Sequence, residues 1–270
     1  MARGRRDGIV IAGGGLAACL AALAMARLRP EVPLLIVEEA DRFGGDGHHH
    51  FPIEEVGEGG AMLIEPMALR RWPGFHVVFP GLARNLRADW AGFAAADLNR
   101  LMLETLDSKQ YRLGAKVVPV RQDALVLDGG EEIRAEGAID ARGAPSLSTL
   151  DLLYRAEFAR IVRLKAPHRL DRPVLVDATV DQAGGFRFMQ CLPLADDRLL
   201  VADVCVSERG QPDDQAPARI DHYLDSRGWV KKRADSASAR IRPLPVGGDF
   251  AAFWRLGGAR VAKLGLRGGF

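Results

Sequence analysis

Residues 9–18 read Ile9-Val10-Ile11-Ala12-Gly13-Gly14-Gly15-Leu16-Ala17-Ala18, an apolar run that passes through three glycines into an alanine-rich stretch reaching Leu28. A second apolar run, Leu34 to Val37, is followed by Glu38. A strand, a glycine turn, a helix and a second strand with an acidic tip form the dinucleotide-binding unit. This stretch therefore predicts a Rossmann-like α/β fold. The alternative is a glycine turn in an α/β protein that binds no nucleotide.

Each position of this motif has a physical reason to bind a dinucleotide. Gly13 permits the tight turn after the strand, and Gly15 lets backbone amides approach a pyrophosphate. Ala18 stands at the third glycine position and still allows the helix to pack closely on the strand. The helix N-terminus adds positive potential and free N–H groups. Glu38, 23 positions after Gly15, can bind ribose hydroxyls and argues against a 2′-phosphate.

The composition is that of an ordinary globular protein. The chain has 270 residues, of which 48% are hydrophobic and 27% charged, and its net charge is +2, which gives no general reason to bind nucleic acid. The basic stretches 3–6 and 231–233 are interpreted as solvated segments, with an anionic membrane surface as the alternative. The helical stretch ending at Leu28 is too short to span a bilayer, so neither a transmembrane segment nor an export signal is expected.

The cysteines and histidines do not indicate a metal site. Cys19, Cys191 and Cys205 are far apart in apolar surroundings, which predicts reduced, buried thiols in a cytoplasmic protein. The consecutive histidines 48–50 cannot all bind one ion with normal geometry. They are therefore predicted to lie in a flexible loop, and no metal is expected.

A later strand narrows the choice of cofactor. Gly137 to Asp140 is predicted to be a strand with an acidic end, followed by a glycine turn at Gly143. In flavoproteins with two dinucleotide-binding domains, a strand of this form closes the FAD site. It would bring Asp140 near the first glycine turn, and Gly143 would let the backbone pass close to the cofactor. Together with the N-terminal unit, this strand favours FAD over NAD.

The pattern as a whole predicts a Rossmann-like FAD-binding domain with an inserted antiparallel β-sheet substrate domain. Residues 1–150 are expected to form the FAD-binding part, with a substrate-side insertion near 47–95. Residues 151–245 are expected to form the substrate-binding sheet, and residues 246–270 to return to the FAD-binding part. The main expected elements are helices at 62–72, 94–106 and 217–226 and strands at 75–79, 115–120, 124–127, 173–177, 185–191 and 199–206.

Several strings taken together resemble the bacterial lycopene β-cyclases of the FAD-dependent carotenoid cyclase family. Besides the glycine turn, they are Arg71-Trp72-Pro73-Gly74-Phe75-His76-Val77-Val78-Phe79-Pro80, Ile139-Asp140-Ala141-Arg142-Gly143, Ala166-Pro167-His168, the stretch 173–180, the stretch 185–188 and Leu192-Pro193-Leu194. The resemblance runs in order from Ile9 to Phe270. Gly44, Gly45 and Gly265, the last in a late flavin-contacting loop, are further candidates for cofactor contacts.

The resemblance implies a redox-neutral cyclisation of lycopene end groups to β-rings. A terminal double bond is protonated, the neighbouring double bond attacks the cation, and loss of a proton leaves the ring. This requires a carboxylic acid that stays protonated in an apolar tunnel. Reduced, anionic FAD stabilises the cation, with NAD(P)H as a possible electron source. Lycopene or a related carotenoid would reach a cytoplasmic protein, or one peripheral on the inner face of the cytoplasmic membrane, from the membrane surface.

The chain departs from the family at the position of that acid. The family's glutamate after the strand 199–201 is replaced by Ala202, so Asp203 is the carboxylate nominated as its substitute. Neighbouring strand residues face opposite ways, so Asp203 serves only if the register shifts, and a surface or turn aspartate is the alternative. Arg240 stands where the family has a glutamate, and the chain stops early in the late flavin-contacting loop. Two other hypotheses therefore stay open: a degenerate or truncated relative that binds flavin or carotenoid without turnover, and an FAD-dependent redox enzyme.

Overall fold

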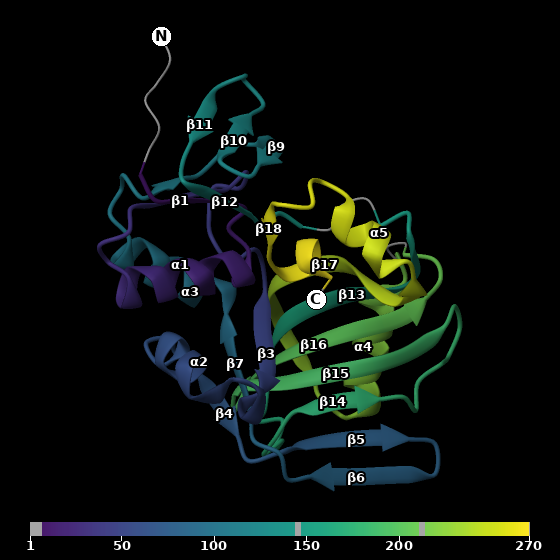
Figure 1. Cartoon of the computed structure of the whole chain (residues 1–270). Coiled ribbons are helices and arrows are strands. Elements are labelled where there is room, and N and C mark those ends of the chain that lie inside the picture. The colour runs from purple at the N-terminus through teal and green to yellow at the C-terminus, as the bar shows by residue number, and fades with distance from the viewer. Residues whose placement is uncertain (1–6, 144–146, 211–213, 270) are drawn as a thin grey trace.

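The predicted first strand lies at the centre of a parallel sheet. The computed structural model describes residues 7–143, 147–210 and 214–269, so the basic stretch 3–6 lies outside the described residues. Strand β1 (Ile9–Ala12) belongs to a five-stranded sheet in the order β18-β12-β1-β2-β8, in which every neighbouring pair is parallel. Its other strands are β2 (Leu34–Val37), β8 (Tyr111–Arg112), β12 (Gly137–Asp140) and β18 (Ala262–Lys263). Figure 1 shows helices α1 (Leu16–Leu28) and α3 (Ala95–Thr105) covering one face of this sheet.

Apolar side chains on both faces of β1 and β2 hold the nucleotide-binding part together. Ile11 and Ile36 pack in the core beneath α1 and α3, whereas Val10 and Val37 pack in the core beneath a three-stranded sheet. That sheet, in the order β11-β10-β9, consists of β9 (Val117–Arg121), β10 (Ala124–Leu127) and β11 (Glu132–Arg134). Strands buried on both faces are continuous apolar runs, which explains why they were recognisable in the sequence.

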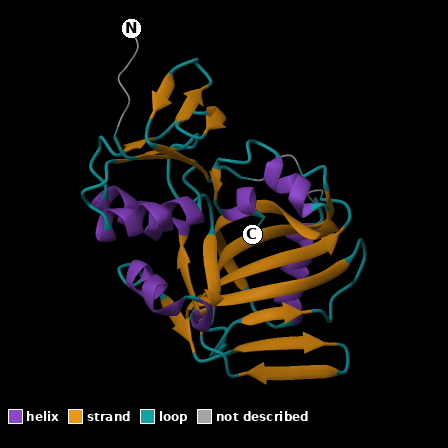
Figure 2. Cartoon of the chain, in the orientation of Figure 1, coloured by secondary structure: helices purple, strands orange, loops and turns teal. Residues whose placement is uncertain are grey.

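The second half of the chain forms most of a larger sheet. Its order is β17-β13-β16-β15-β14-β5-β6, and its pairs are antiparallel except for β14 with β5. The strands are β5 (Phe75–Phe79), β6 (Leu82–Leu86), β13 (Leu150–Leu164), β14 (Val174–Asp177), β15 (Phe186–Ala195), β16 (Arg198–Ser207) and β17 (Lys231–Gly248). This sheet lies beside the parallel one in Figure 2, so the predicted α/β architecture with an inserted antiparallel sheet is confirmed.

The remaining elements lie between the two sheets or against the larger one. Helix α4 (Ala216–Ser226) packs on one face of the larger sheet. A small sheet in the order β3-β7-β4 lies near the opposite face (Figure 1). It consists of β3 (His48–Pro52), β7 (Trp90–Ala94) and β4 (Arg70–Trp72), and η1 (Ile53–Glu55) and α2 (Gly57–Ile64) follow β3. Short helices α5 (Phe250–Arg255) and η2 (Gly265–Gly268) lie near the end of the chain. No helix in the three described ranges combines the length and apolarity needed to cross a membrane.

Two local predictions in the first half were wrong. The helix expected over 62–72 is replaced by the end of α2 at Ile64 and by strand β4, whose three residues pair with β7. Pro66 lies between them, where a helix would lose a backbone hydrogen bond. The loop expected at the three histidines is strand β3, because His48 to Pro52 pair in register with β7. The backbone pairing of β3 outweighed the low apolar content of the histidine run.

The other expected elements match the structure closely, but several strands were missed, among them the short strands β6, β7, β8 and β18. Strands β5, β9, β10, β12, β14, β15 and β16 and helices α3 and α4 occur where the sequence predicted them, within a few residues. Strands β13 and β17 were not predicted, although they are the two longest. The three cysteines are free and buried, as predicted, and burial raises the pKa of Cys19 and of Cys191 to about 12.

A buried carboxylate fastens α4 to the larger sheet. Asp177, at the end of β14, is fully buried and accepts hydrogen bonds from Thr179 Oγ1 at 2.6 Å and from Tyr223 Oη at 2.7 Å. Arg227, just after α4, also donates to this carboxylate. Burial acts to raise the pKa of Asp177, but the hydrogen bonds from Thr179 and Tyr223 outweigh it and hold the pKa below its usual value. The ionised form of Asp177 therefore stabilises the fold.

The substitution Tyr223→Phe is expected to lower the free energy of unfolding by about 1–3 kcal/mol, because a buried hydrogen bond to a carboxylate is lost. Urea unfolding at pH 7 measures this loss. Tyr154→Phe serves as the control, since its half-buried hydroxyl bonds to no described residue, and should change the free energy by less than about 0.5 kcal/mol.

The difference in the free energy of unfolding between the wild type and Tyr223→Phe should depend on pH. A carboxylate whose pKa is lowered in the folded state stabilises the protein above the unfolded value of about 3.9, and this contribution is lost as the pH falls through the folded value. The difference between the wild type and Tyr223→Phe should therefore shrink as the pH is lowered from 7 toward 3. A difference that stays constant would contradict the role assigned to ionised Asp177.

Candidate functional site

A cavity of about 720 Å³ surrounds the glycine turn that follows β1. Its wall is formed by the turn, by the tips of β2 and β12, by the second half of β17 and by η2. The lining residues are Gly13, Gly14, Gly15, Leu16, Ala17, Leu20, Glu38, Ala40, Arg42, Gly45, His49, Ala141, Arg142, Gly143, Leu147, Arg242, Pro243, Leu244, Pro245, Gly265, Leu266 and Gly269. We call this space the first cavity.

Two glycines of the turn are required for different reasons. Gly13 has φ of +101°, and a Cβ atom there would lie 2.7 Å from the carbonyl oxygen of Ala141 beyond β12. Only glycine therefore lets β12 lie beside the turn. Gly15 is in an ordinary conformation, yet a Cβ atom there would meet no protein atom within 4 Å, because the residue faces the first cavity. The missing side chain at Gly15 leaves space for a ligand.

The start of α1 is an open anion-binding site. Gly15 is its N-cap residue, no side chain caps the helix, and no acidic residue lies in its first turn. Arg42 and Arg142 line the same cavity. Glu38, at the tip of β2, accepts hydrogen bonds from the backbone N–H groups of Gly14 and Ala40. This combination of free amides, guanidinium groups and an acidic strand tip suits the phosphates and ribose of a dinucleotide.

Six of the nine predicted cofactor-binding residues line the first cavity. They are Gly13, Gly15, Glu38, Gly45, Gly143 and Gly265. Whether each contacts a cofactor stays a prediction.

The other three predicted residues do not line the first cavity but contact residues that form its wall or the core next to it. Ala18 is fully buried in the core under α1, and Gly44 donates its N–H to the carbonyl of Gly14 at 2.8 Å. Asp140 is buried and accepts two hydrogen bonds from Arg142, at 2.9 and 2.8 Å, and Arg267 Nε lies 3.2 Å from its carboxylate. Asp140 therefore orients Arg142, which does line the cavity.

A second cavity of about 710 Å³ lies next to the first one. The two share Leu16, Leu20, His49, Arg242 and Leu244 as wall residues. The second cavity lies between α1, β3 and α2 on one side and the larger sheet on the other. A ligand in the first cavity would therefore border a ligand in the second.

Polar side chains line one part of the second cavity, whose other lining side chains are mainly apolar. Trp90 Nε1 donates to His50 Nδ1 at 3.2 Å. Arg155 forms an ion pair with Glu157 and lies 3.5 Å from the side-chain oxygen of Gln190. The Glu157 side chain is 14% exposed. Glu157 is thus a carboxylate that the structure places in this cavity.

The pairing of the strands explains why Glu157 and Ala202 share one face of the sheet. Ala159 of β13 lies opposite Ala202 of β16, and Glu157 lies opposite Val204, two residues further along. Ala202 and Val204 are buried in the core on the side of Trp72 and Leu175. Glu157 is therefore a diagonal neighbour of Ala202 on the side that carries the second cavity.

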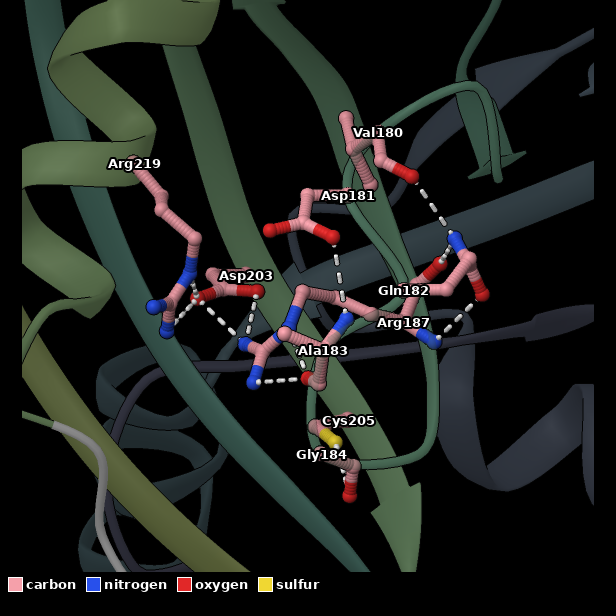
Figure 3. A network of polar contacts seen from close by, with 9 residues as sticks. All are labelled: Val180, Asp181, Gln182, Ala183, Gly184, Arg187, Asp203, Cys205 and Arg219. Atoms are coloured by element: carbon pink, nitrogen blue, oxygen red, sulfur yellow. Dashed lines mark hydrogen bonds and ion pairs between the residues drawn. The ribbon is translucent and has the colours of Figure 1, made fainter.

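Asp203 points toward Arg219 of α4, on the face opposite to that of Ala202, and Figure 3 shows its carboxylate between Arg187 and Arg219. Its side chain is 1% exposed, and both of its oxygens lie 2.9 Å from Arg187 Nη1. Arg219 of α4 donates to it at 2.7 Å, and Arg187 also donates to the carbonyl oxygen of Ala183. A third cavity of about 680 Å³ lies beside this cluster, and Glu157 and Arg240 line it as well as the second cavity.

This placement argues against the prediction that Asp203 is a proton donor in the substrate cavity. The register of β16 is regular around Asp203, and α4 covers the face to which Asp203 points. Two guanidinium groups share the carboxylate, which is the geometry of a structural ion-pair cluster. We therefore assign Asp203 to the attachment of α4 and of the loop at Ala183.

Sequence reasoning missed the polar residues of the second cavity. Arg155 and Glu157 alternate with Ala156 and Phe158, and Arg240 and Arg242 flank Ile241. This period of two is the signal of a strand with one polar face. It was hidden because neither stretch was recognised as a strand.

Comparisons with known proteins identify relatives of this chain by sequence and by fold. The family model for "Lycopene cyclase protein" matches residues 8–270. A lycopene beta-cyclase from Pseudescherichia vulneris is 30% identical over 262 residues, which cover 97% of this chain and 67% of that protein. A geranylgeranyl bacteriochlorophyll reductase-like protein from Thermoplasma acidophilum has a TM-score of 0.70 at 12% identity, covering 98% of this chain and 72% of that one. A flavin-dependent halogenase from Xanthomonas campestris has a TM-score of 0.66 at 18% identity, covering 99% and 67%.

The substitution Asp203→Asn is expected to lower the free energy of unfolding by about 3–5 kcal/mol, because the buried Arg187 would lose the charged carboxylate that its Nη1 contacts. Urea unfolding measures this loss. The exposed Asp181, in the loop held by Arg187, provides the matched control, and Asp181→Asn should cost less than about 1 kcal/mol. Equal stability of the wild type and Asp203→Asn would contradict the role of Asp203 in attaching α4 and the loop at Ala183.

Proposed function

The chain belongs to the lycopene cyclase family, and we propose that it is an FAD-dependent enzyme that cyclises the end group of lycopene or a related carotenoid. The reaction is an isomerisation. Protonation of a terminal double bond gives a cation, the neighbouring double bond closes the ring, and loss of a different proton gives the β-ring. The observation that carries the proposal is the pair of cavities that share a wall, one at a dinucleotide-type turn and one with a mainly apolar wall.

The first cavity fits FAD on the evidence of its own residues. Gly15 leaves room at the turn, the N–H groups of α1 are uncapped, and Arg42 and Arg142 offer positive charge to a pyrophosphate. Reduced FAD, when bound, supplies negative charge next to a cationic intermediate, and NAD(P)H is the proposed reductant. The division into an FAD-binding part, 1–150 and 246–270, and a substrate part, 151–245, belongs to the same proposal.

The carboxyl group proposed for proton transfer is Glu157. Alanine at position 202 cannot move a proton, and Asp203 faces α4. Glu157 lies on the neighbouring strand, on the cavity side and one diagonal step from Ala202. Its ion pair with Arg155 holds the resting carboxylate, so Glu157 must take up a proton before it can protonate the substrate. Glu55 also lines the second cavity, but it lies in η1 and is exposed.

A membrane surface is the proposed source of the substrate, because a long polyene partitions into lipid. The edge strand β6 exposes Leu82 and Leu86, and Phe186 is exposed beside Phe79 of β5. Arg84 and Arg87 are exposed on the same edge and could contact anionic lipid. Association with the inner face of the cytoplasmic membrane is proposed on this basis.

Cyclisation is tested with lycopene, FAD and dithionite without oxygen in D₂O. The expected product has the composition of the substrate apart from one deuterium for each ring formed, as measured by mass spectrometry. Glu157→Gln should lower the rate at least about a hundredfold with unchanged FAD affinity, and the control Glu55→Gln should lower it less than about threefold. A product that has gained oxygen or lost hydrogen would support a redox enzyme instead. Flavin binding without any product would support a relative that binds without turnover.

The substitution Gly15→Ala tests the cofactor site separately from the reaction. A Cβ atom at this position would enter the first cavity and meet no protein atom within 4 Å, so we expect at least about a tenfold loss of FAD affinity with a nearly unchanged melting temperature. Flavin fluorescence titration and thermal unfolding measure the two quantities. Gly129→Ala is the matched control, because its site is equally open but lies in the turn after β10. FAD affinity equal to that of the wild type would contradict the placement of FAD in the first cavity.

A further inference from the structure

Three arginines meet at the second cavity from two neighbouring strands. Arg155 of β13 lies opposite Arg242 of β17, and Glu157 lies opposite Arg240 in the next row on the same side. All four side chains line the cavity. The strand pairing thus concentrates positive charge at one end of a site whose wall is otherwise mainly apolar.

The negative charge at this end does not balance the positive charge. Arg155 pairs with Glu157, but neither Arg240 nor Arg242 has a carboxylate within ion-pair distance in the described part of the chain. Arg240 Nη2 is buried against Gly47 and has no hydrogen-bond partner among the described residues, so a ligand would meet the other nitrogens of this guanidinium group. Buried guanidinium N–H groups are costly to leave unpaired.

The neighbouring histidines do not change this balance. Burial and the charge of Arg198 and Arg240 lower the pKa of His48 to about 4, and burial with the charge of Arg155 lowers the pKa of His50 to about 4. Both imidazoles are therefore neutral at pH 7 and contribute neither charge nor an anionic partner. Burial and the charge of Arg240 also lower the pKa of Arg242, which reflects the repulsion within the cluster.

The rest of the second cavity suits a long hydrocarbon. Leu20, Phe51, Leu63, Trp90, Phe93 and Phe188 are among its lining side chains. Its volume of about 710 Å³ lies in the range of sites that enclose whole small molecules. One ligand can satisfy both the apolar wall and the arginine end only if it is amphipathic.

We propose that the second cavity binds a long polyene that carries a carboxylate, which Arg240 and Arg242 hold at the polar end. The inference rests on the proposed function in taking this cavity as the substrate site, and it adds polyenes with an acidic group to the hydrocarbon carotenoids as ligands of that site. A carboxylate accepts charge-assisted hydrogen bonds from guanidinium groups, which a hydrocarbon cannot do. Arg240 and Arg242 are binding residues in this assignment.

Binding of all-trans-retinoic acid and of its methyl ester tests the proposal, because the two differ in charge and share one polyene. Trp90 lines the cavity, so quenching of tryptophan fluorescence reports binding. The full chain is titrated at pH 8, with and without FAD. We expect the acid to bind at least about tenfold more tightly than the ester, as the loss of a charge-assisted hydrogen bond implies.

Variants show where that preference arises. Arg240→Gln combined with Arg242→Gln should bring the affinities of acid and ester within about twofold of each other. Arg84→Gln on the exposed edge of β6 should keep the wild-type preference. Circular dichroism and thermal unfolding check that each variant is folded.

Two results would overturn the proposal: equal affinities of acid and ester in the wild type, or an undiminished preference in the folded double variant. A preference that disappears when FAD is added would assign the arginines to the flavin and would also overturn it. No turnover enters this experiment. Failure to cyclise lycopene would therefore count against the proposed reaction and not against the acid-binding site.

Discussion

The strict alternation of side chains along the strands of the larger sheet determines what each face can do. Neighbouring residues of β16 face opposite ways, so Ala202 belongs to the cavity side and Asp203 to the α4 side. The same rule places Glu157 and Arg240 together, since they lie opposite each other across β13 and β17. One face of the sheet therefore carries the second cavity, and the other carries α4 and the Asp203 cluster that holds it.

The parts of the fold that could be predicted from the sequence are those in which a short stretch of residues has its own structural preference. The glycine turn was recognisable because Gly13 needs a positive φ and the apolar strands on either side are buried on both faces. Strand β17 was not recognisable because its first half consists of charged and small residues at an exposed edge. Pairing with β13 over nearly its whole length forms this strand, and a pairing of that kind is not visible in either segment alone.

The candidate site was predictable only in part, for a related reason. The residues around the first cavity lie in short local motifs, and six of the nine predicted ones do line it. The second cavity combines residues from α1, β3, β13 and β17, which are far apart in the sequence. The sequence alone does not show that three arginines line the cavity proposed for a hydrocarbon, because only the pairing of β13 with β17 brings them together. The resemblance to the family gave the reaction class, whereas the side chains of this chain define the chemistry of the cavity.

The wall shared by the two cavities has a thermodynamic consequence. Leu16, Leu20, His49, Arg242 and Leu244 contribute to both spaces, so occupancy of one changes the surface that the other presents. Linkage then requires that each ligand alter the affinity of the other by the same factor. The affinity for a flavin in the first cavity and that for a polyene in the second should therefore depend on each other.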